Sequence, residues 1–133
     1  MKTKSLFRMI VAIVAVMLLS CISTSAYAKN YAGTYTFTDA SKKTYTMVLK
    51  PGKIVYGNHE GKGVIYYKGK IVDYLSWTGN KEYCTIEYSD VRFLFPDGER
   101  DYGRAYIKGA YLYKNYNARD AEHPKKRLKL TKK

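Results

Sequence analysis

Residues 34–38 read TYTFT and residues 44–50 read TYTMVLK, with the polar stretch DASKK at 39–43 between them. In both segments every second side chain is large and apolar or aromatic. This period of two is typical of antiparallel strands that bury one face, and the polar stretch has the residues of a turn. The two segments therefore predict a β-hairpin, and with it an all-β fold.

The same alternation continues along the chain. Its segments are separated by glycine- or proline-containing breaks at 51–52, 60–63, 68–70, 78–80, 96–98 and 108–109. The regular spacing predicts a single antiparallel up-and-down barrel or sandwich of about eight to ten short strands, with Val91–Phe95 as one of them.

The C-terminal part of the chain carries two further signals. Asn117–His123 is the one stretch that predicts a short helical turn, with Asn117 as its N-cap and Pro124 as its stop. Beyond it, residues 127–132 alternate again, and we expect them to return as a strand that pairs with an open sheet edge.

The first residues have the features of an export signal. Basic residues precede an apolar run at Met9–Leu19, and Ala26-Tyr27-Ala28 offers a small-x-small cleavage site. The run is shorter than the roughly 20 residues of a membrane-spanning helix. We therefore expect a signal peptide at 1–28, cleaved after Ala28, and a periplasmic or secreted protein.

A second processing site overlaps the first. Leu18-Leu19-Ser20-Cys21 resembles a bacterial lipobox. In this alternative the leader is 1–20, Cys21 carries the lipid, and the protein is anchored to the outer membrane.

Residues 29–133 are expected to form one basic domain. Three of the 24 basic residues and none of the 11 acidic ones lie in 1–28, so the remainder has a formal charge of +10. The cysteines of the chain are Cys21 and Cys84, and both processing routes remove Cys21 as a thiol. We therefore expect no internal disulfide, and a buried Cys84.

Catalytic and metal-binding patterns are missing from the sequence. His59 and His123 are isolated, and Asp97, Glu99 and Asp101 alternate with arginine and without a calcium-loop glycine. Neither a nucleophile elbow nor a phosphate-binding glycine loop is present. We expect a non-catalytic protein without metal or cofactor.

The apolar and aromatic side chains of the predicted strands suggest a binding role. The chain has 15 tyrosines, and aromatic residues fall on both faces of several segments. We expect the side chains that point into the barrel to bind a small apolar or amphipathic ligand at an open end. Alternatively, the aromatic face binds a protein partner. The candidate cavity residues are Tyr35, Phe37, Met47, Leu75, Trp77, Ile86 and Phe93.

An alternative function is based on the basic C-terminal segment. Lys125, Lys126, Arg127 and Lys129 could bind an anionic polysaccharide or a membrane surface. Nucleic acid suits an exported protein less well. The same residues are also explained as a closing strand whose lysines protect a sheet edge.

Three features together resemble a known family: the opening Gly33-Thr34-Tyr35, the chain of short hairpins, and the closing Arg127-Leu128-Lys129-Leu130. They look like small lipocalin-like or calycin-like barrel domains of exported bacterial proteins, including many from Bacteroidetes. Lipocalins proper have tryptophan where this chain has Tyr35, and most are longer. The resemblance implies a barrel rather than a particular ligand.

Overall fold

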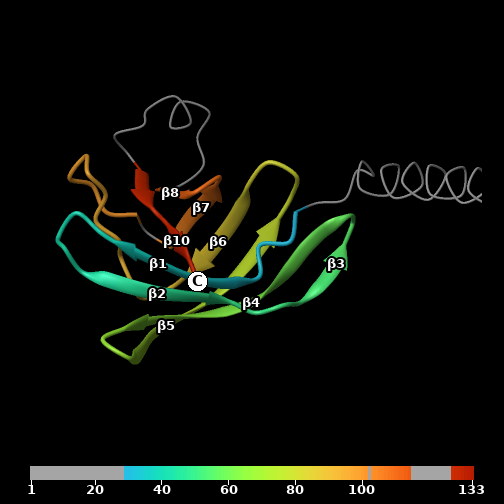
Figure 1. The fold of residues 1–133 in the computed structure, drawn as a ribbon, viewed down its shortest axis with the longest axis horizontal. Coiled ribbons are helices and arrows are strands. Elements are labelled where there is room, and N and C mark those ends of the chain that lie inside the picture. The colour runs from blue at the N-terminus through green and yellow to red at the C-terminus, as the bar shows by residue number, and fades with distance from the viewer. Residues whose placement is uncertain (1–28, 102, 115–126) are drawn as a thin grey trace, which may run out of the picture.

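The computed structural model describes residues 29–101, 103–114 and 127–133. Every element in these ranges is a β-strand, and every strand pairing is antiparallel. The predicted antiparallel all-β fold is confirmed (Figure 1). The strands are β1 (Gly33–Thr38), β2 (Thr44–Leu49), β3 (Lys53–Val55), β4 (Asn58–Tyr67), β5 (Lys70–Gly79), β6 (Cys84–Tyr88), β7 (Arg104–Lys108), β8 (Tyr111–Lys114), β9 (Arg127–Lys129) and β10 (Thr131–Lys132).

The last stretch of chain nearly closes the sheet into a barrel. The strand order is β10-β1-β2-β4-β5-β6-β7-β8-β9, with β3 paired to β4 alone. β9 pairs with β8 while β10 pairs with β1. Leu130, between them, donates its backbone N–H to the carbonyl of Ala110 at 2.8 Å. One bent segment thus covers both open edges of the sheet, as the alternation at 127–132 predicted.

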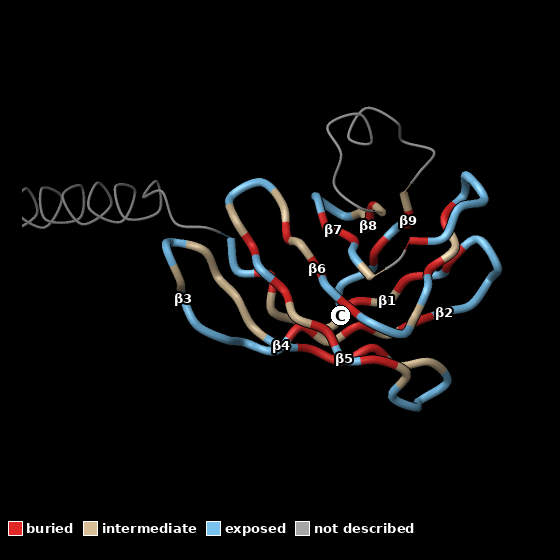
Figure 2. The backbone as a smooth tube through the Cα atoms, turned by 180° about the vertical axis from the view of Figure 1, so that it is seen from behind, coloured by how far each residue is buried: buried red, intermediate tan, exposed pale blue. Residues whose placement is uncertain are grey.

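Strands β3 and β4 form a hairpin that extends beyond the barrel rim (Figures 1 and 2). Its turn has positive φ at both central residues, Tyr56 (51°) and Gly57 (79°), as in a type I′ turn. We call residues 53–60 the arm. The rim from which it projects is the arm end of the barrel, and the opposite rim is the loop end.

Glu60–Gly63 does not form the predicted break, because these residues continue β4. Gly61 lies opposite Trp77 and Gly63 opposite Leu75. A Cβ on Gly61 would lie 2.5 Å from the Lys50 carbonyl oxygen, and one on Gly63 would lie 2.8 Å from Leu75 Cδ1. These glycines serve close packing inside a strand rather than a turn.

The segment between β6 and β7 covers the loop end. Val91–Phe95 does not form the predicted strand: it makes one isolated bridge, between Leu94 and Arg100. Phe93 and Phe95 are instead fully buried in the core. The Phe93 ring lies 4.9 Å from Phe37 and 5.1 Å from Tyr45, between ring centroids. The alternating apolar residues therefore close the loop end of the barrel instead of extending the sheet, and we call Val91–Phe95 the plug.

A buried carboxylate fixes this plug. Asp73 Oδ2 accepts backbone N–H bonds from Ser89, Asp90 and Val91 at 3.0, 2.7 and 3.0 Å. Its Oδ1 accepts from the Tyr74 N–H at 2.8 Å and the Ser89 hydroxyl at 3.1 Å. Burial alone would raise the pKa of Asp73, but these hydrogen bonds outweigh it and hold the pKa below its usual value.

At the arm end, Tyr31 is buried, and its carbonyl accepts a 2.7 Å hydrogen bond from the Tyr35 hydroxyl. Cys84 is also fully buried, as predicted. Burial raises the pKa of its thiol to about 12, so it remains protonated and unreactive at neutral pH. Aromatic and aliphatic side chains thus fill the barrel from one end to the other.

Candidate functional site

The seven predicted cavity residues are all buried inside the barrel, six of them on strands and Phe93 in the segment that covers the loop end. They belong to one buried core cluster together with the residues that plug the two ends. The predicted inward phase is correct for the six residues on strands, and the role of all seven in ligand binding stays a prediction. Two of them also border pockets that open to the outside: Trp77 and Leu75.

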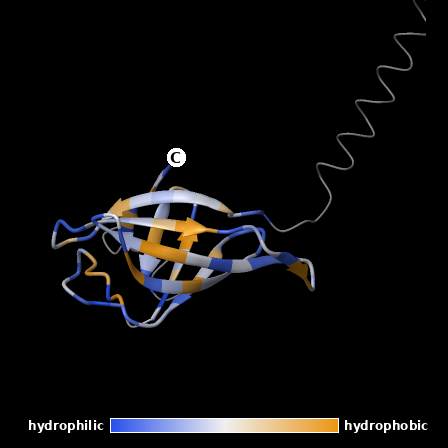
Figure 3. Ribbon diagram, turned by 90° about the horizontal axis from the view of Figure 1, so that it is seen from below, coloured by the Kyte–Doolittle hydropathy of each residue, from blue (hydrophilic) through white to orange (hydrophobic). Residues whose placement is uncertain are grey.

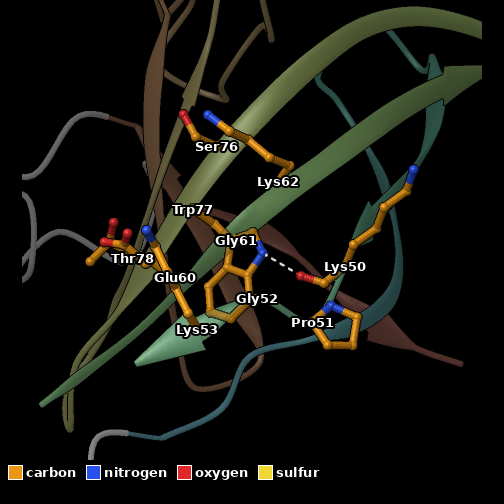
Figure 4. Close-up of a pocket in the computed structure, with 10 residues that line it drawn as sticks. All are labelled: Lys50, Pro51, Gly52, Lys53, Glu60, Gly61, Lys62, Ser76, Trp77 and Thr78. Carbon is orange, nitrogen blue, oxygen red and sulfur yellow. Dashed lines mark hydrogen bonds between the residues drawn. The ribbon is translucent and has the colours of Figure 1, made fainter. Parts of the chain in front are cut away.

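Two adjoining pockets lie along β4 and β5, and both include Lys62 and Ser76. We call them together the β4–β5 groove. The larger one, next to the arm, has a volume of about 640 Å³ (Figure 4). It is lined by Lys50, Pro51, Gly52, Lys53, Glu60, Gly61, Lys62, Ser76, Trp77 and Thr78. The smaller one, of about 340 Å³, is lined by Lys62, Tyr74, Leu75, Ser76, Glu87, Tyr88 and Ser89.

The shape of the larger pocket depends on a break between β2 and β3. Lys50 still pairs with β4, since its N–H donates to the Lys62 carbonyl at 2.8 Å. After it the chain bends, and the Trp77 Nε1–H donates to the Lys50 carbonyl at 3.0 Å (Figure 4). A Cβ at Gly52 would lie 1.8 Å from the Glu60 carbonyl oxygen, so the bend requires glycine there. The indole thus fixes the break and forms an apolar wall.

The polar groups of this pocket are mainly cationic. Lys50, Lys53 and Lys62 are exposed, and Glu60 is the one acidic residue of the lining. Lys62 is paired across the strands with Ser76, and in Figure 4 the ammonium group and the hydroxyl lie on the same side. Three ammonium groups with neighbouring hydroxyls give a surface that attracts anions and donates hydrogen bonds.

Beyond Lys62 the groove becomes aromatic. Tyr74 is 67% exposed, and its cross-strand partner Val64 is buried. Ile71, also on β5, is 50% exposed. An exposed tyrosine ring beside lysine side chains can stack on a planar or sugar ring while its hydroxyl stays in water.

The predicted basic surface lies elsewhere on the barrel. Three strands separate β5 from β9 or β10 in either direction around the sheet. The Arg127 guanidinium lies 3.7 Å from the Tyr111 ring centroid and donates to the Tyr113 hydroxyl at 3.5 Å. Lys129 is exposed.

The other predicted features of the two termini fall outside the described residues. These are the leader with Cys21 and Ala28, the helical turn at Asn117–His123, and the tail residues Lys125 and Lys126.

Lys50, Lys53 and Lys62 do not stand out as a group in the sequence. They are scattered among the other 21 basic residues, and no local cluster marks them. The pairing of residue 50 with residue 62 and of residue 53 with residue 60 brings them together. Only the register between these strands, which single-sequence patterns do not fix, would have revealed the site.

The described ranges, 29–101, 103–114 and 127–133, also bear on metal sites and membrane-spanning helices. No set of three or more His, Cys, Asp or Glu side chains there is placed to hold a metal ion. The same residues include no helix with the length and apolar character needed to span a membrane.

The chain was also compared with models of known protein families, with curated proteins and with solved structures, and none of the three comparisons gives a match.

Proposed function

We propose that this protein is an exported, non-catalytic binding domain that holds a stretch of anionic polysaccharide in the β4–β5 groove. The observation that carries the proposal is the position of Lys62 and Ser76. They join a pocket with three lysines to one that contains the exposed ring of Tyr74. Charge and aromatic surface thus form one continuous track along two neighbouring strands.

Each part of the track fits one part of an acidic sugar chain. The ammonium groups of Lys50, Lys53 and Lys62 would face carboxylate, sulfate or phosphate groups. The hydroxyls of Ser76 and Thr78 can exchange hydrogen bonds with sugar hydroxyls. Tyr74 offers a flat face for the apolar side of a sugar ring.

The open form of the groove favours a polymer over an enclosed small molecule, because small-molecule sites bury most of the ligand surface. The barrel interior is occupied by packed rings, with Phe93 4.9 Å from Phe37 and 4.9 Å from Tyr88. On this proposal the lipocalin-like or calycin-like relationship describes the scaffold, and the ligand binds outside it. The leader at 1–28 would deliver the domain to a compartment where acidic polysaccharides occur.

A titration with charged and neutral polymers tests the proposal. We expect the protein to bind heparin, dextran sulfate or polygalacturonate and not neutral dextran. Binding should weaken steeply with salt, because condensed counterions are released when the lysines bind.

A pair of charge-matched variants locates the site. Lys53→Gln with Lys62→Gln removes two cations from the groove, and we expect about a tenfold loss of affinity. Lys108→Gln with Lys129→Gln removes two exposed cations from other strands, and we expect less than a twofold change. Equal losses in the two variants, or salt-independent binding, would contradict the proposal.

A further inference from the structure

Acidic residues are distributed unevenly between the two ends of the barrel. Six of the nine acidic residues in the described ranges belong to the loop end: Asp39, Asp73, Asp90, Asp97, Glu99 and Asp101. In the described ranges the arm end has only Glu60 and Glu82, among six lysines: Lys29, Lys53, Lys81, Lys108, Lys129 and Lys133. Among the described residues the formal charge is +4 at the arm end. The loop end is near +1, because its basic residues offset its acidic ones: Lys42, Lys43, Lys68, Lys70, Arg92, Arg100 and Lys114. The arm end is therefore the more cationic rim.

The arm that projects from this rim has an apolar tip. Tyr56 is 100% exposed, and Ile54 is 56% exposed. Tyr56 also occupies a left-handed turn position, with φ of 51°, where asparagine, aspartate and glycine are strongly preferred. Figure 3 shows the apolar strand β3 near the end of the projecting hairpin. An aromatic side chain at such a position does not serve the local backbone.

We propose that the arm end binds the surface of an anionic lipid bilayer. Tyr56 and Ile54 enter the boundary between headgroups and acyl chains, where tyrosine is enriched in membrane proteins. Lys29, Lys53 and Lys81 face the anionic headgroups. Lipid, rather than a protein groove, is the occupant because the apolar tip is small and convex while the cations spread around it.

The described start of the chain lies at the same end. The Lys29 N–H donates to the Asn80 carbonyl at 3.3 Å, and Gly79, the residue before Asn80, pairs with His59 of the arm. A lipid on Cys21, as in the second processing route, would thus hold the arm end toward the membrane. The proposal does not depend on that lipid, because the arm residues and the rim lysines are the contacts.

Vesicle sedimentation tests the proposal with residues 29–133, which contain every strand of the barrel. We expect this chain to partition into vesicles that contain phosphatidylglycerol and to bind pure phosphatidylcholine vesicles much less. Tyr56→Asn with Ile54→Thr should lower partitioning at least about tenfold. Both replacements suit their backbone positions, and a thermal unfolding curve verifies that the variant folds.

The chain offers a matched control of the same residue types. Tyr74→Asn with Ile71→Thr removes from β5 a tyrosine that is 67% exposed and an isoleucine that is 50% exposed. This control should keep vesicle binding and lose polysaccharide binding, while the arm variant should do the reverse. Lys53 belongs to both proposed sites, but neither variant changes it, so each site can fail while the other is kept.

A tryptophan at the tip reports contact with lipid directly. In a Tyr56→Trp variant we expect fluorescence to shift to the blue with anionic vesicles and to be quenched by brominated lipid. Trp77 is buried and provides a constant background. The proposal is wrong if the tip tryptophan is not quenched, or if partitioning does not depend on the phosphatidylglycerol content of the vesicles. It is also wrong if the arm and β5 variants lose vesicle binding equally.

Discussion

Replacing Asp73 by asparagine tests how the plug at the loop end is held in place. The substitution keeps the shape of the side chain and removes its charge. In the native protein the carboxylate is 3% exposed and accepts five hydrogen bonds, four of them from backbone N–H groups. An amide has only one accepting oxygen, so the variant cannot satisfy all of these donors.

The loss of unfolding free energy can be estimated for the amide orientation that keeps the most hydrogen bonds. With its oxygen at the Oδ2 position, it keeps the bonds from Ser89, Asp90 and Val91, but as weaker neutral ones. Its NH₂ group then faces the Tyr74 N–H, which loses its acceptor, while the Ser89 hydroxyl can rotate. One buried N–H without an acceptor and three weakened bonds give a loss of about 2–4 kcal/mol. For a domain of this size the melting temperature should fall by about 10–25 °C.

Urea denaturation followed by circular dichroism measures the loss. Asp90→Asn is the control, because Asp90 is exposed and its change of charge is the same. We expect the control to stay within about 0.5 kcal/mol of the wild type. A loss below about 0.5 kcal/mol in Asp73→Asn would refute the reasoning that this carboxylate fixes the plug.

The same variant has a pH signature. Because the folded pKa of Asp73 is lowered, its contribution to stability is complete above the unfolded value of about 4 and is lost as the pH falls through the folded value. The wild type should therefore lose stability more steeply than Asp73→Asn below about pH 4. Parallel acid-unfolding curves would contradict this assignment.

Three further substitutions probe the core, the bend and the groove. Phe93→Ala should cost about 3–5 kcal/mol of unfolding free energy in urea titrations, because Phe93 is fully buried among aromatic rings. Gly61→Ala should cost about 1–3 kcal/mol and shift the fluorescence of Trp77, since a Cβ at Gly61 would lie 2.8 Å from the indole Nε1 and 2.5 Å from the carbonyl oxygen of Lys50. Tyr74→Ala should lower affinity for acidic polysaccharide by about 1–2 kcal/mol in calorimetric titrations and leave the melting temperature within a few degrees.

The sequence predicted the inner face of the barrel well, for a simple reason. Side chains alternate strictly between the two faces of a strand, so the period of two assigns every residue once one is assigned. Met47, Trp77 and Ile86 lie on three different strands, and all are buried as this rule predicts.

The sequence misled where one pattern has two structural meanings. Val91–Phe95 alternates like a strand, yet it plugs the barrel because Asp73 holds the preceding residues in a turn. Glu60–Gly63 has the composition of a turn, yet its glycines make room for Trp77 and Leu75 across the strands. Both errors arise from contacts between residues more than ten positions apart.

The groove was not predictable for a related reason. Lys50 and Lys62 are twelve positions apart, and only the pairing of β2 with β4 brings them together. The basic C-terminal segment, by contrast, is contiguous in sequence and therefore attracted the prediction of a polyanion site. Local clustering marks charge density along the chain, but a groove across strands depends on register.

Chemical-shift mapping of the isotope-labelled protein during titration with an acidic polysaccharide tests the central claim most directly. We predict shifts for Lys53, Lys62, Tyr74 and Ser76, with the methyl signals of the buried Met47 and Ile86 unchanged. The claim is contradicted if the shifts concentrate on Arg127 and Lys129, or if the methyl groups of the core respond first.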